Sequence, residues 1–249
     1  MDLKNTFQLF KKSFKLDKRF LRVILLDALF YVIAIPVFMI YNIIINKQAQ
    51  GLESIIGTTD VSSYLTTASA AELSFITADM HTFIFTFIIG AIVLFLVCLF
   101  SYSLSRILIW NYLLKKKFDI KKYLKFNLLN IILLIGAVII LLIALLISLI
   151  SAVVFSIVLF LLMVGIIYFM FSLYIEYVKT GRLFYSFGNA FKRMDKNVYL
   201  LSLPVFIIIA IIIPLLTGLF AGTILNNIIS VVLLFLFAAW MRIFVLESK

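Results

Sequence analysis

Long apolar runs separated by short polar segments dominate the chain. They lie at about 21–45, 83–113, 127–178, 199–218 and 224–245. Each is long enough for a membrane-spanning helix, which needs roughly 20 predominantly apolar residues. The runs are continuous, whereas the strands of a membrane barrel alternate apolar and polar positions over ~10 residues. The pattern therefore predicts an all-α, polytopic bundle of transmembrane helices.

The run at 127–178 is too long for one crossing. Its 52 positions contain a single charged residue, Glu176. One helix of this length would extend ~78 Å, against a hydrocarbon core of ~30 Å. Ser148, Ser151 and Ser156 mark the least apolar place to turn, so we expect two helices here. Residues 1–249 are then one integral membrane domain with a polar outer loop at 47–81 and six spans, at about 21–45, 83–113, 127–148, 152–178, 199–218 and 224–245.

The distribution of basic residues predicts the orientation. With the N-terminus inside, 21 of the 22 lysines and arginines fall in inner segments, and only Lys47 lies outside. Lysine and arginine are strongly enriched in cytoplasmic segments of membrane proteins. This asymmetry favours six spans with both termini in the cytoplasm, in a cell membrane that we take to be a prokaryotic plasma membrane.

Two basic segments have the spacing of amphipathic helices lying in the membrane interface. In 1–19 the apolar stripe is Leu3, Phe7, Phe10 and Phe14, and in 179–198 it is Leu183, Phe184, Phe187, Phe191 and Met194. Similar basic sequences follow Asp17, Asp119 and Asp195. We therefore expect a basic interfacial helix before each odd-numbered span, in three repeated units. The alternative is that each is only a positively charged flank.

Composition supports the membrane assignment. Hydrophobic residues make up 65% of the chain, against about half in an ordinary soluble domain. The net charge of +11 comes from residues beside the apolar runs, so the expected partner is anionic lipid headgroups at the cytoplasmic face and not nucleic acid. A protein partner or a second copy of the chain is also compatible with the sequence. The single cysteine, Cys98, excludes an intrachain disulfide.

Three ionisable residues lie inside predicted spans, where charge is costly and therefore marks a candidate site. Asp27, Arg106 and Glu176 all fall in the cytoplasmic half, and their signs permit pairing. We expect a contact between Asp27 and Arg106, with Glu176, Ser103 and Asn111 as further members. Such a cluster is either a structural ion pair or a substrate or proton site. Separate snorkelling of each side chain to the interface is the third interpretation.

Signals for enzymatic chemistry are few. The only histidine, His81, is at the outer mouth of the second span, where a polar anchor is the simpler interpretation. Asp79 lies close by, but a metal site needs several ligands at short spacing. We therefore predict no enzymatic activity, no cofactor and no metal site. Gly218 and Gly222 form a Gly-x-x-x-Gly pattern that permits close helix packing.

The layout resembles a known group of proteins. Six spans, basic amphipathic helices before the odd spans, and the segment Ser186-Phe187-Gly188-Asn189-Ala190-Phe191 are similar to those of a diffuse group of prokaryotic membrane proteins. That group includes the membrane domain fused to some glycerophosphodiester phosphodiesterases. The resemblance implies no catalytic residue in this chain, because the chemistry of those fusions belongs to a separate soluble domain.

Three functions stay open at this stage. The first is a non-enzymatic scaffold, assembly or membrane-organising protein. The second is a transporter or permease-like bundle, for a hydrophobic or lipidic substrate because spans three to five lack polar residues near the midplane. The third is a lipid-processing membrane enzyme, for which the chain offers few acidic residues.

Overall fold

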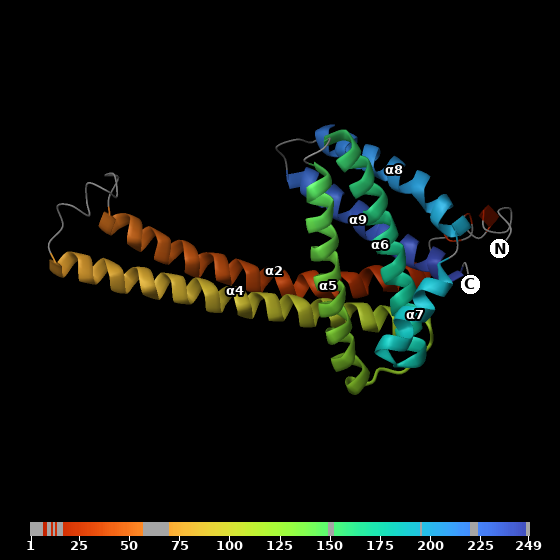
Figure 1. Cartoon of the computed structure of the whole chain (residues 1–249), viewed down its shortest axis with the longest axis horizontal. Helices are drawn as coiled ribbons and strands as arrows, with labels where there is room; N and C mark the ends of the chain where they lie inside the picture. The colour runs from red at the N-terminus through yellow and green to blue at the C-terminus, as the bar shows by residue number, and fades with distance from the viewer. Residues whose placement is uncertain are drawn as a thin grey trace. The chain divides into compact units, whose positions relative to one another are not determined.

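The computed structural model describes residues 7–8, 11, 13, 17–56, 70–148, 152–194, 196–219 and 224–247. These residues are almost entirely helical and contain no strand (Figure 1). The helices are α2 (Lys18–Ile56), α4 (Ala70–Leu113), α5 (Ile120–Ser148), α6 (Ala152–Thr180), α7 (Leu183–Arg193), α8 (Lys196–Leu219) and α9 (Ile224–Glu247). The predicted all-α fold is confirmed.

Five helices within the described ranges are long and apolar enough to cross a membrane. They are Lys18–Glu53, Ile76–Leu113, Ile120–Ile143, Val154–Thr180 and Ile229–Glu247. In α8 the stretch Val198–Ile208 is apolar but shorter. The chain therefore has the character of a multi-pass membrane protein.

The helices α2 and α4 are longer than the sequence predicted. The segment 47–81 was expected to be a loop, but α2 continues to Ile56 and α4 already begins at Ala70. At 1.5 Å per residue these helices extend ~58 Å and ~66 Å, well beyond a ~30 Å hydrocarbon core. Loss of hydrophobicity marks the edge of a membrane and not the end of a helix, since backbone hydrogen bonds inside a helix persist in either solvent.

Aspartates begin two of the helices. Asp17 accepts a hydrogen bond from the Phe20 amide at 2.8 Å, directly before α2, and Asp119 accepts from the Lys121 amide at 2.9 Å, directly before α5. A side-chain oxygen in this position pairs one of the amides that a helix start leaves unbonded. The resemblance between these two segments thus reflects a shared helix start. Asp195, the third copy, lies outside the described residues.

Of the three expected interfacial helices, one is seen as a separate element. Most of 1–19 lies outside the described residues. The prediction of a separate interfacial helix before the third span is wrong. Residues 114–119 are not helical, and the basic residues after them form the first turns of α5 itself. Before α8, however, α7 is a distinct helix. Gly181, with a φ of +68°, makes the turn from α6 to α7, a conformation that favours glycine.

The buried residues gather near one end of several helices. The chain divides into two compact units, 1–28 with 103–249, and 29–102. In the first, α6 contacts α5, α7, α8 and α9. Its core joins the start of α2, the last turns of α4 and α9, the start of α5 and the second half of α6; its largest fully buried side chains include Trp110, Phe126, Tyr168, Tyr174, Tyr177 and Phe244. These are the helix ends that adjoin the basic segments.

The other halves of these helices expose apolar side chains. Large hydrophobic residues are exposed along 134–145 of α5, 154–163 of α6, 200–215 of α8 and 231–236 of α9. Contiguous apolar surface on this scale is not stable in water. Lipid is the solvent that fits it.

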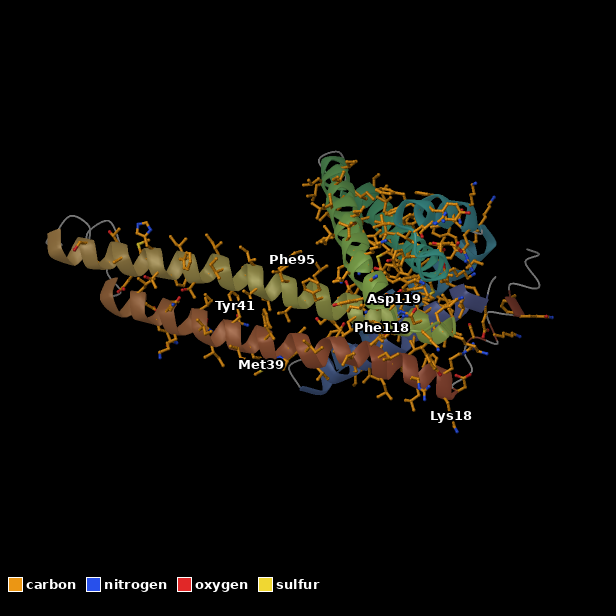
Figure 2. The ribbon with its side chains drawn as sticks, turned by 90° about the horizontal axis from the view of Figure 1, so that it is seen from below. Lys18, Met39, Tyr41, Phe95, Phe118 and Asp119 are labelled. Atoms are coloured by element: carbon orange, nitrogen blue, oxygen red, sulfur yellow. The ribbon has the colours of Figure 1, made fainter. Side chains whose placement is uncertain are left out.

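In the second unit, α2 and α4 pack as an antiparallel pair. The Tyr41 ring lies between the two helices (Figure 2), and its hydroxyl donates to the Phe87 carbonyl oxygen at 3.3 Å. The close approach depends on Gly90, because a Cβ there would lie 2.6 Å from Tyr41 Cε2. Among the described glycines, Gly90 is the one whose added Cβ would lie nearest to another atom.

Gly90→Ala is expected to weaken this pairing by about 1–3 kcal/mol, the usual cost of overpacking. Gly136→Ala is a matched control, since a Cβ at Gly136 meets no described atom within 4 Å. Thermal unfolding in detergent would compare the two variants. The double variant Gly90→Ala/Tyr41→Ala should recover most of the loss, and equal unfolding temperatures for both alanine variants would contradict the packing.

Candidate functional site

A carboxylate shared by two arginines lies in the core of the first unit. Asp27 on α2 forms ion pairs with Arg106 on α4 through one oxygen and with Arg242 on α9 through the other. Asp27 is 1% exposed, Arg106 9% and Arg242 2%. Three helices far apart in the sequence therefore meet at one buried carboxylate, which we call the Asp27 cluster.

Neighbouring groups hold the members of the Asp27 cluster in place. The Ser105 hydroxyl, one residue before Arg106, donates to the Leu26 carbonyl oxygen at 2.7 Å and fixes the register of α2 against α4. The Arg242 guanidinium lies 5.7 Å from the centre of the Phe171 ring on α6, within cation–π range. The ring adds a fourth helix to the contacts of the cluster.

The structure brings together only part of the predicted set. Asp27 and Arg106 meet as expected from their similar depth and opposite charge. Glu176, expected to join them, instead pairs with Arg193 on α7. This is a correction, because the turn at Gly181 folds α7 back onto the end of α6 and supplies Glu176 with a cation nearer in sequence.

Arg242 is the member that sequence reasoning missed. It lies near the end of the last apolar run and was interpreted as a positively charged flank. The available signal is Trp240, two residues earlier, because tryptophan is enriched at membrane interfaces, but it does not show which way Arg242 faces. In the structure Trp240 is also buried, and its indole nitrogen donates to the Ser13 hydroxyl at 2.8 Å.

A second buried polar network connects α4, α5 and α6. The Asn130 side-chain amide donates to the Ser103 hydroxyl at 2.7 Å and accepts from the Tyr174 hydroxyl at 2.6 Å. Ser103, which was expected near Asp27, therefore belongs to this hydrogen-bonded network of neutral side chains. Asn111, the other expected member, is buried on α4. Buried polar groups satisfied in this way fix one helix register.

Near α7 the protein surface is hollowed and polar. The hollow has a volume of about 350 Å³ and is lined by Glu176, Asn189, Lys192 and Arg193. On the same helix Phe184 is 84% exposed and Phe191 65% exposed, whereas Ser186 and Ala190 face the core. The predicted apolar stripe thus divides: three of its members pack against the core, Leu183, Phe187 and Met194, and its other two phenylalanines are exposed.

The remaining predicted site residues do not form a site in the described part of the chain. A Cβ added at Gly218 would have no described atom within 4 Å, and Gly222 lies outside the described residues. Within the same ranges, His, Cys, Asp and Glu form no group of three placed to hold a metal ion.

Comparison of the chain with protein-family models, with curated proteins and with solved structures gave no match. Two arginines on one carboxylate form a buried group with charges of opposite sign in contact, which resists separation because an unpaired charge in this environment is costly. The Asp27 cluster therefore holds α2, α4 and α9 together through ion pairs.

Proposed function

We propose that the chain is a six-span membrane protein with both termini in the cytoplasm, and that it acts as a non-enzymatic scaffold that organises anionic lipid at its inner face. In this proposal α8 is the fifth span. The observation that carries it is that the buried core, the Asp27 cluster and the basic segments all occupy the same helix ends. Among the described residues of α5, α6, α8 and α9, the buried polar side chains lie toward the core ends, and the opposite halves expose apolar side chains.

The shape of α7 supports lipid organisation at the inner face. Phe184 and Phe191 are exposed on a helix that also carries exposed Lys192. An interfacial helix buries its aromatic side chains among acyl chains and holds its cations at headgroup level. Lys115, Lys116, Lys117 and Lys121 are also exposed, after α4 and at the start of α5. Together they supply a cationic surface for anionic headgroups.

Lys192→Gln is expected to lower the preference for anionic over zwitterionic lipid about fivefold, since a lysine near an anionic surface contributes about 1 kcal/mol. Lys47→Gln is the matched control, because Lys47 is exposed and alone on the predicted outer side. The measurement is the association of spin-labelled phosphatidylglycerol and phosphatidylcholine with the reconstituted full-length chain. Equal association of the two lipids with the wild-type chain would refute lipid organisation.

The scaffold role needs a separate measurement. Extraction into nanodiscs directly from the membrane, followed by mass spectrometry of what stays bound, should find a stoichiometric protein partner together with anionic lipid. A single lipid or small molecule that is lost in Asp27→Asn, while the fold is retained, would instead favour the transporter or lipid-handling function.

A further inference from the structure

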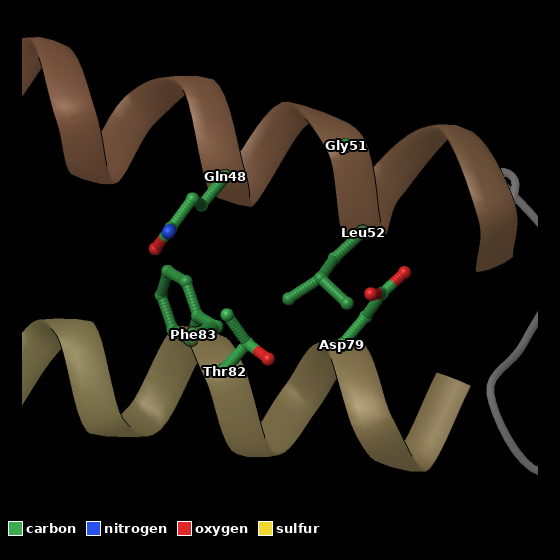
Figure 3. A pocket seen from close by; sticks show the side chains of 6 residues that line it. All are labelled: Gln48, Gly51, Leu52, Asp79, Thr82 and Phe83. Atoms are coloured by element: carbon green, nitrogen blue, oxygen red, sulfur yellow. The ribbon is translucent and has the colours of Figure 1, made fainter. Parts of the chain in front are cut away.

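The outer part of the α2–α4 pair contains a second hollow, separate from the Asp27 cluster. Its volume is about 200 Å³, and its lining residues are Gln48, Gly51, Leu52, Asp79, Thr82 and Phe83. This is smaller than the ~300–1,000 Å³ pockets of drug-sized ligands. Figure 3 shows Gln48 and Phe83 toward one end and Asp79 toward the other, with Leu52 and Thr82 between them. Such a hollow suits a short molecule with polar groups at both ends.

Two acceptors in this hollow have no donor in the described part of the chain. Asp79 forms no ion pair or hydrogen bond there. The Gln48 side-chain oxygen is buried without a partner, while its nitrogen donates to the Thr86 hydroxyl at 3.2 Å and fixes the amide in position. Buried polar atoms normally have partners, so the Gln48 oxygen is suited to a ligand that donates a hydrogen bond. Asp79 is half-buried, and its carboxylate is open to a donor of positive charge.

The charge around the hollow favours a cation. Asp79 is the one charged side chain among the described residues that line it, and its charge is negative. The lining is a poor site for direct coordination of a divalent ion, because Mg²⁺ and Ca²⁺ need six or more oxygen ligands and the Leu52 and Phe83 side chains supply none. A Phe83 ring, in contrast, can contact an organic ammonium group or the carbon chain beside it.

We propose that this hollow binds a small primary amine. Asp79 receives the ammonium group, Leu52 and Phe83 contact the carbon chain, and the Gln48 carbonyl oxygen accepts from a hydroxyl or second amine at the far end. The same ammonium chemistry occurs in a free amine and in the headgroup of phosphatidylethanolamine.

The probe is 4-amino-1-butanol, and 1,4-butanediol is its neutral counterpart of the same length. Saturation-transfer NMR on the full chain in phosphatidylcholine nanodiscs should show at least tenfold tighter binding of the amine, because only the amine brings a positive charge to its hydrogen bond with the Asp79 carboxylate. Equal binding of the two probes would overturn the proposal, as would displacement of the amine by equimolar Mg²⁺.

Three variants test whether the amine binds in this hollow. Asp79→Asn should remove the difference between amine and diol. Gly51→Leu should block both, since Gly51 lines the hollow and a Cβ there meets no described atom within 4 Å, which leaves room for the longer side chain. Glu53→Gln removes an exposed carboxylate outside the lining and should change nothing. Unaltered amine binding in Asp79→Asn, with circular dichroism unchanged, would sink the idea.

Exchanging phosphatidylcholine for phosphatidylethanolamine identifies the source of the ligand. If the lipid headgroup occupies the hollow, the apparent affinity for 4-amino-1-butanol should fall severalfold in phosphatidylethanolamine nanodiscs. An unchanged affinity assigns the hollow to a free amine. Neither result depends on Lys192 or on lipid selectivity at the inner face.

Discussion

Asp27→Asn is expected to destabilise the first unit by about 3–5 kcal/mol, the cost of breaking a buried ion pair by removing one partner. Arg106 and Arg242 would lose the carboxylate they share, at a place where Asp27 is 1% exposed. Asparagine keeps one acceptor but turns a donor toward one of the two guanidinium groups. The change should appear as a lower free energy of unfolding in mild detergent, by denaturant or steric trapping.

Glu53→Gln supplies the control for loss of a carboxylate, because Glu53 is exposed on α2. A triple variant, Asp27→Leu/Arg106→Met/Arg242→Met, distinguishes a structural from a functional cluster. If the cluster only joins helices, the triple variant should unfold near the wild-type free energy, since well-packed apolar groups replace a buried ionic cluster at little cost. A stable Asp27→Asn protein would contradict the structural role altogether.

Trp110→Ala is expected to cost about 3–5 kcal/mol, the usual penalty for removing a buried aromatic side chain. Trp110 is fully buried in α4, with its ring centre 5.9 Å from that of Phe171 on α6. Leu142→Ala, in the half of α5 away from the core, should change the free energy of unfolding by less than about 0.5 kcal/mol, because Leu142 is 58% exposed. Detergent unfolding of both variants measures the difference.

This pair tests where the core lies. Similar costs for Trp110→Ala and Leu142→Ala would mean that the halves exposed in the structure pack against one another in the membrane. A large difference would support a bundle held together mainly at the end that carries the basic segments.

The sequence by itself determined the features that depend on solvent and chain length. Apolar runs of this length require lipid, and 52 nearly uncharged residues cannot form one crossing, so the division between α5 and α6 was predictable. The pairing of Asp27 with Arg106 followed from depth and charge, because each residue had few partners of opposite sign at its level in the membrane.

Tertiary structure decided the features that depend on which face of a helix meets another. Arg242 faces Asp27 and Glu176 turns to Arg193 because of helix rotation and the Gly181 turn, which hydropathy does not record. The Tyr41–Gly90 contact likewise needs two particular helix faces in register. Hydropathy reports the solvent around a segment, whereas side-chain pairing depends on rotation about each helix axis, and only packing fixes that rotation.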